Sequence, residues 1–374
     1  MDPLAHTLFG ATMAEAGLKR KTALAAATVI IGANIPDIDA AAMLVSSDYA
    51  LLVRRGWTHG ILALFIWPFL LTGIMLVVDR LLKSRKKARP GPPVHKGWLL
   101  GVAFLGVWSH PLLDWLNTYG VRILMPFDGT WFYGDTLFII DPWLWLLVGA
   151  GVVLARSNTW KSITGWIVLG TSVSALVLTA DIVPFAAKIV WSVSLIIIVW
   201  MRWSGKFREQ AQSVALGLLI MAIGYATFMF TGARMAVNHA QNYFAGEGIS
   251  VNEIMPNPLP ARLLLRTGVA ASDTHYHRFT VNWTDSDSFQ IYGDPIPIEI
   301  PDTITSAALE ADEVRGLMNW IRFPLYEVRE EDNGWLVIIR DLRYVEPGQD
   351  TSEGIGMAFV YLNDELDIVR VGAD

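Results

Sequence analysis

Long apolar runs are the strongest constraint on what this chain can fold into. Residues 60–82, GILALFIWPFLLTGIMLVVDRLL, contain no charged side chain before Asp79. A helix rises about 1.5 Å per residue, so this run is long enough to cross a hydrocarbon core about 30 Å thick. Further apolar runs occupy residues 97–117, 141–155, 163–180, 184–201 and 212–232 and, more weakly, 22–44. We therefore expect an integral membrane protein in the cell (inner) membrane that crosses it several times.

The composition supports this expectation and excludes other classes. Charged residues make up 17% of the chain, whereas soluble domains carry roughly 25%. The net charge of −6 argues against a nucleic-acid-binding surface, which would be basic. The absence of cysteine excludes disulfides and thiolate metal ligands. The lipid bilayer is the expected partner, and no pattern indicates the oligomeric state.

The character of the sequence changes near residue 235. Residues 250–374 are rich in acidic side chains and contain alternating runs such as GWLVIIRDLRYV (334–345), separated by turn-like clusters. Such alternation is typical of strands. We predict a membrane all-α helical bundle of about six to eight transmembrane or re-entrant helices over residues 1–234. A soluble strand-rich α+β domain is expected to follow over residues 235–374.

The distribution of basic residues predicts how the chain is oriented. The segments 80–96 and 201–209 are strongly basic, and short basic loops face the cytoplasm. Alternating the helices from these loops makes residues 212–232 cross from inside to outside, so the strand-rich domain is predicted to be extracytoplasmic. The weakest assignment is a first membrane segment at residues 3–17, because 15 residues barely span a bilayer.

This orientation brings ionisable side chains to one membrane face. They are His6 in the first segment, Asp37 and Asp39 in the second, His59 before the third, and His110 and Asp114 in the fourth. Each lies toward the predicted outer end of its segment. Random placement of polar residues would not gather them in this way.

The stretch WSHPLLDWLNTYG (108–120) is the most informative part of this set. His110 and Asp114 are four residues apart, so on a helix they share one face, which Asn117 extends. Both side chains could then reach one ion, or the carboxylate could bridge two. The simpler interpretation is a His–Asp hydrogen bond between packed helices. Ionisable groups cost roughly 2.5–3.5 kcal/mol each inside a membrane, and a divalent cation would supply a compensating charge.

The other members of the set each have a simpler interpretation when taken alone. Asp37 and Asp39 in NIPDID suit a helix-capping turn, and His59, close to Trp57, suits an interfacial anchor. His6 alone is more often a packed histidine. Together the set offers imidazole and carboxylate ligands without thiolate, which suits Zn²⁺ and also Mn²⁺ or Fe²⁺. Two close metals would activate a hydroxide and stabilise the leaving oxygen of a phosphoester.

The same motifs carry a family resemblance. DPLAHTLFG, NIPDID, RRGWTHGIL and SHPLLDWLNTYGVRILMPF resemble the YdjM-type family of membrane-bound metal-dependent hydrolases over about residues 1–145. The order of histidines and aspartates is also similar to part of the ligand set of bacterial zinc-dependent phospholipase C. The resemblance implies as ligands His6, one of the pair Asp37 and Asp39, His59, His110 and Asp114, with Asp114 as a plausible bridge.

One departure from the phospholipase pattern limits the number of ions. No further His and no His-x-x-x-Glu pair follows Asp114, so at most two metals are implied. GDTLFIIDPW (134–143) offers Asp135 and Asp141 on the same outer side. Either is a candidate general base or extra ligand, and we name Asp141 as the catalytic candidate. Its alternative role is to cap the following helix.

The remaining polar candidates are weaker. His95 lies in a basic loop, His239 follows the last apolar run, and His275 and His277 share one face of an expected strand. The last two form a potential surface metal pair, although most such pairs bind nothing. Arg122 could contact an anionic substrate, but an interfacial anchor is the preferred interpretation.

The function expected from these residues is that of an integral-membrane metal-dependent hydrolase. One or two divalent ions, Zn²⁺ foremost, would activate a water near the outer face, and a carboxylate such as Asp39 or Asp141 would take its proton. Because the site opens at headgroup depth, a lipid phosphoester or another amphiphilic ester is the expected substrate class.

Two other interpretations stay open at this point. In the first, the chain is a non-enzymatic scaffold or transport-related protein with a structural metal site. The apolar inner halves of the helices, such as LLGVAFLGV, count against an ion pathway. In the second, the C-terminal domain is the working part, but residues 250–374 contain no catalytic constellation.

Overall fold

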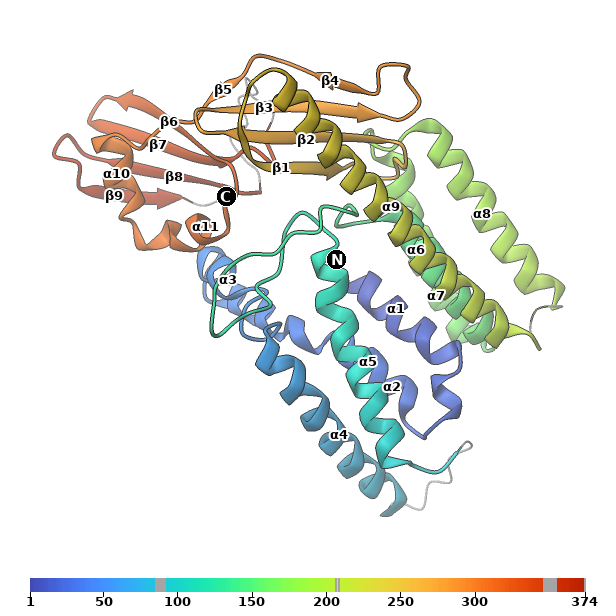
Figure 1. The fold of residues 1–374 in the computed structure, drawn as a ribbon. Helices are drawn as coiled ribbons and strands as arrows, with labels where there is room; N and C mark the ends of the chain where they lie inside the picture. Colours follow the sequence, from blue (N-terminus) through green and yellow to red (C-terminus); the bar gives the residue numbers. More distant parts are fainter. Residues whose placement is uncertain (85–91, 206, 208, 346–354, 373–374) are drawn as a thin grey trace. The chain divides into compact units, whose positions relative to one another are not determined.

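The chain divides into two compact units, each of which is described separately. The computed structural model describes residues 1–84, 92–205, 207, 209–345 and 355–372 (Figure 1). The helical unit comprises residues 1–37, 58–235 and 258–266, and the sheet unit comprises residues 38–57, 236–257 and 267–374. Residues 85–91 of the basic segment 80–96, and residues 206 and 208 of the basic segment 201–209, lie outside the described residues.

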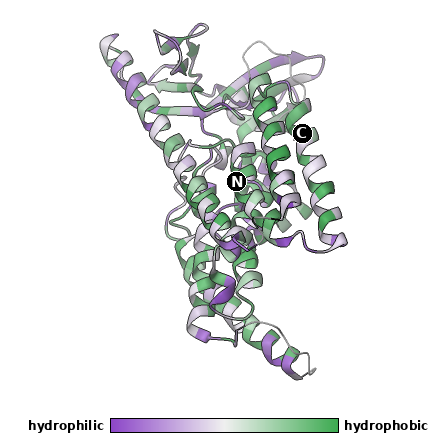
Figure 2. Cartoon of the chain, turned by 90° about the vertical axis from the view of Figure 1, so that its right-hand side faces the viewer, coloured by the Kyte–Doolittle hydropathy of each residue, from purple (hydrophilic) through white to green (hydrophobic). Residues whose placement is uncertain are grey.

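The helical unit contains most of the apolar sequence. Its helices are α1 (Pro3–Glu15), a 3-10 turn η1 (Leu18–Arg20), α2 (Ala25–Gly32), α4 (Ile61–Ser84), α5 (Lys96–Trp115), α6 (Pro142–Arg156), α7 (Trp160–Thr179), α8 (Phe185–Ser204) and the first part of α9 (Ala211–Gly246). Figure 2 shows hydrophobic residues along most of the length of these helices. This distribution is that of helices that contact lipid on one side and one another on the other.

Fewer helices than expected meet the requirements for a membrane span. In the described part of the chain, α4, α7, α8 and α9 are long and apolar enough to cross a bilayer, and α2 with the following 3-10 helix η2 (Ile35–Leu44) would make a fifth, broken span. The predicted number of six to eight is therefore not confirmed. Helices α1 and α6 are 13 and 15 residues long, which is shorter than the about 20 residues that a perpendicular span needs.

Local sequence signals explain where several helices begin. Asp2 precedes α1 and accepts a hydrogen bond from the backbone N–H of Ala5 at 3.0 Å, and proline occupies the start of α1. Asp141 caps α6 in the same way by accepting from the N–H of Leu144 at 2.9 Å. Thr159 and Ser162 form a reciprocal capping box at the start of α7. Each cap satisfies N–H groups that have no partner inside the helix.

Glycines bring α2 and α5 into backbone contact. A Cβ atom at Gly106 of α5 would lie 2.7 Å from the carbonyl oxygen of Val29, and one at Gly32 would lie 3.2 Å from the amide nitrogen of Val107. The first distance is shorter than real Cβ contacts, and the second is tighter than most of them. Gly10 makes a similar approach from α1 to Val29. Small residues allow this close packing of helices in a membrane, where dispersion contacts hold helices together.

The sheet unit confirms the predicted strand-rich C-terminal region. Its first sheet has five strands, β1 (Val251–Pro258), β2 (Leu265–Ser272), β3 (His275–Asn282), β4 (Phe289–Ile291) and β5 (Ile296–Pro297), in the order β1-β2-β3-β4 with β5 paired to β3. Its second sheet has four antiparallel strands, β6 (Pro324–Glu331), β7 (Gly334–Asp341), β8 (Met357–Leu362) and β9 (Ile368–Gly372), paired in sequence order. Three short helices accompany the sheets, α3 (Ser47–Val53), α10 (Thr303–Leu309) and α11 (Arg315–Trp320).

A segment from the N-terminal half of the chain forms part of the sheet unit. Helix α3 packs against α11, where the backbone N–H of Leu317 donates to Oδ1 of Asp48 at 2.9 Å. A Cβ atom at Gly316 would lie 1.9 Å from the carbonyl oxygen of Asp48, so only glycine permits this contact. Residues 38–57 therefore fold with partners that are far away in the sequence.

The contact between α2 and α5 can be tested by adding a side chain at its centre. We expect Gly106→Val to lower the thermal unfolding midpoint of the purified full-length protein in detergent. The new methyl groups meet the backbone of α2, which cannot rotate away, and overpacking of this kind costs about 1–3 kcal/mol.

Gly101→Val is the matched control, because it makes the same change on the same helix where a Cβ atom meets nothing within 4 Å. Equal midpoints for the two variants would show that the close approach does not stabilise the helical unit.

Candidate metal site

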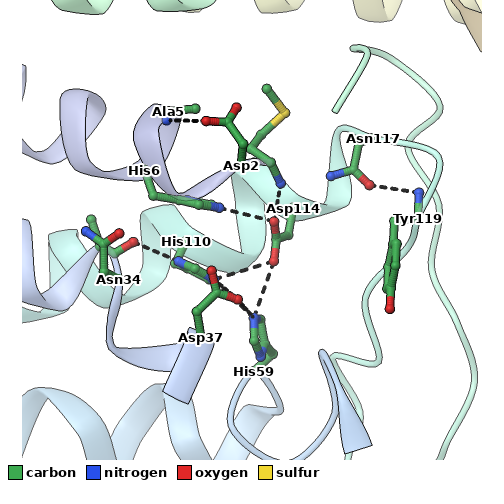
Figure 3. A network of polar contacts seen from close by, with 12 residues as sticks. Asp2, Ala5, His6, Asn34, Asp37, His59, His110, Asp114, Asn117 and Tyr119 are labelled. Atoms are coloured by element: carbon green, nitrogen blue, oxygen red, sulfur yellow. Dashed lines mark hydrogen bonds and ion pairs between the residues drawn. The ribbon is translucent and has the colours of Figure 1, made fainter. Parts of the chain in front are cut away.

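Four predicted ligands come together in the helical unit. Asp37 lies in η2 just after α2, His59 lies just before α4, and His110 and Asp114 lie one turn apart on α5. One ligand atom from each residue falls within 4.8 Å of all the others, and Figure 3 shows the side chains converging. We call these four residues the His/Asp cluster. This group could hold a metal ion.

The two histidines of the cluster are held with one nitrogen directed inward. Nδ1 of His110 lies 2.7 Å from the carbonyl oxygen of Ala33. Because a carbonyl only accepts, Nδ1 must carry a proton, and in the neutral ring Nε2 then has a lone pair toward the cluster. Nδ1 of His59 similarly contacts Oγ1 of Thr58 at 2.9 Å. Hydrogen bonds of this kind orient metal-binding histidines.

The distances between ligand atoms suit a tetrahedral ion. The two Nε2 atoms of His59 and His110 are 3.1 Å apart, and Oδ2 of Asp114 lies 3.3 Å and 3.4 Å from them. Oδ1 of Asp37 lies 3.8 Å and 3.6 Å from the same nitrogens. Bonds of about 2.0–2.1 Å to a tetrahedral ion would separate neighbouring ligands by about 3.3–3.4 Å. The side chains therefore fit a divalent ion.

Burial makes a compensating positive charge necessary. His59, His110 and Asp114 have no exposed surface, whereas the side chain of Asp37 is 15% exposed. Ionised carboxylates that are removed from water need a counter-charge. The amino group of Met1 supplies one such charge at Oδ1 of Asp114, and an ion bound by the cluster would supply another. The exposed side of Asp37 is where the cluster reaches the molecular surface.

His6 contacts the cluster from α1 but is not one of its four members. Its Nε2 lies 3.2 Å from Oδ1 of Asp114, and its ring stacks on His110 with the centroids 3.8 Å apart. His6 is fully buried, and its Nδ1 has no hydrogen-bond partner among the residues that the structure describes. The amino group of Met1 also contacts Oδ1 of Asp114. Asp114 thus presents Oδ2 to the cluster and Oδ1 to His6 (Figure 3).

The two aspartates of NIPDID have different partners. Asp37 belongs to the cluster. Asp39 belongs to the sheet unit, where its Oδ2 accepts from the backbone N–H of Arg55 at 2.9 Å. The family resemblance left open which of the two binds metal, and the structure groups Asp37 with the histidines.

The two acidic residues of GDTLFIIDPW contact other parts of the helical unit. Oδ1 of Asp141 accepts a hydrogen bond from the N–H of Leu144 at 2.9 Å. Its Oδ2 accepts one from the hydroxyl of Tyr225 at 2.7 Å. Asp135 offers its backbone carbonyl to the buried guanidinium of Arg266 at 3.0 Å. Asp141 therefore caps α6 and contacts α9. A catalytic role for it stays a prediction.

The weaker candidates do not form a second group. Among the described residues, the His/Asp cluster is the one set of three or more potential ligands that comes together. His95 is exposed at the start of α5, and His239 packs edge-on against Trp283. The rings of His275 and His277 are 6.2 Å apart on β3, and burial, with His275 nearby, lowers the pKa of His277.

Arg122 is buried and has an aromatic partner. Its guanidinium lies 4.8 Å from the ring centroid of Trp131. This stacking is a packing contact within the loop that follows α5, and it provides no sign of an anionic ligand.

Two groups that orient the histidines were not anticipated from the sequence. Thr58 is the residue next to His59 in WTHG, so its hydroxyl was visible as a potential partner. The role of the Ala33 carbonyl cannot be recognised in the sequence, because every residue has a backbone carbonyl. Its role depends on the close approach of α2 to α5.

The apolar helices and the buried cluster define a membrane protein with a candidate metal site. A model of the YdjM inner membrane protein family matches residues 1–187. The chain belongs to this family, as its sequence motifs predicted, and the match includes His6 and all four residues of the cluster. No curated protein and no solved structure matches the chain. The likeness to the ligand pattern of phospholipase C is not confirmed by these comparisons.

Metal analysis tests the cluster directly. We expect about one divalent ion per chain in the purified full-length protein, and we expect His110→Ala and Asp114→Asn each to lose it. Each substitution removes a buried ligand of a site with few donors. Inductively coupled plasma mass spectrometry after exchange into metal-free detergent buffer would measure the content.

Asp141→Asn is the matched control, since it neutralises another buried carboxylate of the same unit while asparagine remains a good helix cap. It should keep the ion. Undiminished metal in both cluster variants, or equal loss in the control, would contradict the site.

Proposed function

We propose that this chain is a membrane-embedded metal-dependent hydrolase that cleaves an ester or phosphoester. The observation that carries the proposal is the His/Asp cluster, with three ligands fully buried and the fourth, Asp37, partly exposed. A catalytic metal site needs ligands that are held firmly and one side that is open to substrate. The cluster has both properties.

The ligand types favour one borderline ion, for which Zn²⁺ is the first choice and Mn²⁺ or Fe²⁺ are alternatives. Two imidazoles and two carboxylates surround the site. When bound, the ion would supply a water of lowered pKa and polarise a carbonyl or phosphoryl oxygen. We assign one ion, because the four residues of the cluster each direct one ligand atom to the same place.

Each residue of the cluster has a separate task. His110 is oriented by the carbonyl of Ala33, and His59 by the hydroxyl of Thr58. Asp114 supplies a buried charge next to both rings. Asp37, on the side that reaches solvent, is the carboxylate best placed to exchange a proton with a substrate or a water.

We further propose that His6 acts through Asp114. Its Nε2 is at hydrogen-bonding distance from Oδ1 and stacking on His110 fixes its ring. A proton donated by His6 would hold the carboxylate so that Oδ2 faces the ligands of the cluster. Outer partners of this kind commonly contribute 10–100-fold to metal affinity or activity.

The proposed orientation puts the cluster near the outer membrane face. On α5 the cationic Lys96 is at the start and His110 near the end, and on α4 His59 precedes the start while Lys83 is in the last turn. The cluster and the basic residues thus occupy opposite ends of the same helices. Basic ends face the cytoplasm, so the substrate would be a lipid or another amphiphile approached at outer headgroup depth, and the sheet unit would be extracytoplasmic.

A structural metal site is the second candidate. Four protein ligands are enough to complete a tetrahedron, and closed coordination is typical of structural zinc. The cluster would then join η2, the start of α4 and α5 without catalysis. Activity separates the two candidates, because metal content would be the same in both.

Hydrolysis tests the first candidate. We expect the metal-loaded protein in detergent to cleave bis-p-nitrophenyl phosphate or p-nitrophenyl butyrate, with loss of the rate in a chelator and recovery on adding Zn²⁺. Asp114→Asn should lower the rate at least about 100-fold, since loss of an outer partner alone costs 10–100-fold. Release of p-nitrophenol at 405 nm is the measurement.

The control is His95→Ala, which removes an exposed histidine and should keep the wild-type rate. A protein that holds one ion per chain but cleaves neither probe, nor a phospholipid in mixed micelles, would instead support the structural site.

His6→Ala tests the role of the histidine on α1. We expect the variant to retain its ion while the turnover rate falls 10–100-fold, because Asp114 loses one of the groups that contact its Oδ1. Turnover and metal content are measured on the same sample. Loss of the ion in step with activity would show that His6 is itself a ligand, and unchanged turnover would show that it only packs.

A further inference from the structure

An apolar groove lies among four helices of the helical unit, away from the His/Asp cluster. Helices α1, α6, α7 and α8 enclose a volume of about 720 Å³ whose lining is almost wholly apolar. Sites for small ligands occupy about 300–1,000 Å³. The volume of the groove is therefore that of a small-ligand site, and its apolar lining suits a hydrocarbon ligand.

Glycines keep the groove open. Gly149 of α6 and Gly170 of α7 both line it. A Cβ atom at Gly170 would meet nothing within 4 Å, and one at Gly149 would meet only the side chain of Leu8, at 3.6 Å. The space is thus bounded by helix backbones and is not filled by side chains.

The length of the groove corresponds to one leaflet of a bilayer. Its lining runs from Ile163 to Ser174 on α7 and from Trp191 to Trp203 on α8. At 1.5 Å per residue these stretches are about 17–18 Å long, and one half of a hydrocarbon core of about 30 Å is about 15 Å. A single acyl chain that lies along the helices would fit this length.

One end of the groove carries a positive charge. The guanidinium of Arg202 donates to the carbonyl of Ser157, and among the described residues it has no carboxylate partner. Trp203 beside it is 86% exposed. Tryptophan and arginine are typical of the headgroup level, and a guanidinium is well suited to bind phosphate.

We propose that this groove binds one acyl chain of an anionic glycerophospholipid, with the phosphate of the lipid on Arg202. The apolar lining takes the chain, and the uncompensated cation at its end takes the headgroup.

This lipid site is separate from the cluster. Leu4 and Leu8 of α1 line the groove, and they are two residues on either side of His6, so they lie on the opposite face of the helix. Helix α1 thus has the groove on one face and the cluster on the other. The proposal does not depend on hydrolysis or on a bound metal.

Photolabelling of the full-length protein in vesicles tests the proposal. The probe is phosphatidylglycerol with a diazirine in one acyl chain, and labelled peptides are located by mass spectrometry. We expect label on the groove-lining parts of α7 and α8, and at least a five-fold loss of that label in Gly170→Trp, which fills the groove. Gly165→Trp is the matched control, because it makes the same change on α7 at a residue outside the groove where a Cβ atom meets nothing within 4 Å. This variant should be labelled as strongly as the wild type.

The charge is tested with a second pair of variants. Arg202→Gln should lower labelling by phosphatidylglycerol several-fold but leave labelling by a diacylglycerol with the same diazirine chain unchanged. Lys161→Gln, an exposed cation at the start of α7, should change neither.

Three results would overturn the proposal. Equal loss of label in the two tryptophan variants would mean that the lipid is merely part of the surrounding bilayer. Crosslinks between two copies through α7 and α8 would mean that the groove is an interface of the protein with itself. Equal labelling of Arg202→Gln and wild type by phosphatidylglycerol would exclude the phosphate contact.

Discussion

The backbone contact between α2 and α5 is the constraint on which the candidate site depends. Gly32 and Gly106 let the two helices approach until no side chain fits between them. The carbonyl of Ala33, just after α2, then lies 2.7 Å from Nδ1 of His110. That single hydrogen bond fixes the tautomer of the histidine and directs its other nitrogen toward Asp37, His59 and Asp114. The small residues thus allow the close approach of the two helices, and this approach in turn orients a candidate metal ligand.

Electrostatics explains why the cluster is so compact. Two carboxylates and two imidazoles whose ligand atoms lie within 4.8 Å of one another would be unfavourable in a buried place without positive charge. The ligands come from three separate segments of the chain, so an ion bound there would also join those segments. Stability of the helical unit and occupancy of the site are for this reason expected to be linked.

The grouping of Asp37, His59, His110 and Asp114 could be predicted from the sequence. His110 and Asp114 could be paired from their spacing, and the other ligands could be gathered because each lies at the same end of its apolar segment. The choice of Asp37 over Asp39 could not be made, since both follow the same proline and only the packing of residues 38–57 separates them. The predicted number of spans is not confirmed, because apolar composition does not distinguish a short helix such as α6 (Pro142–Arg156) from one that is long enough to cross a bilayer. The strand-rich C-terminal region was correctly predicted from its alternating pattern, but the pairing of its strands and the contact of α3 with α11 depend on residues distant in the sequence.

The place of α3 in the sheet unit has a consequence for loop entropy. Asp37 and His59 are two members of the His/Asp cluster, and the chain between them would be a long flexible loop if residues 38–57 were unfolded. Closing such a loop costs free energy that grows with the logarithm of its length. The hydrogen bond from Leu317 to Asp48 and the close contact at Gly316 keep part of that loop folded. The C-terminal part of the chain therefore lowers the entropic cost of bringing Asp37 and His59 together.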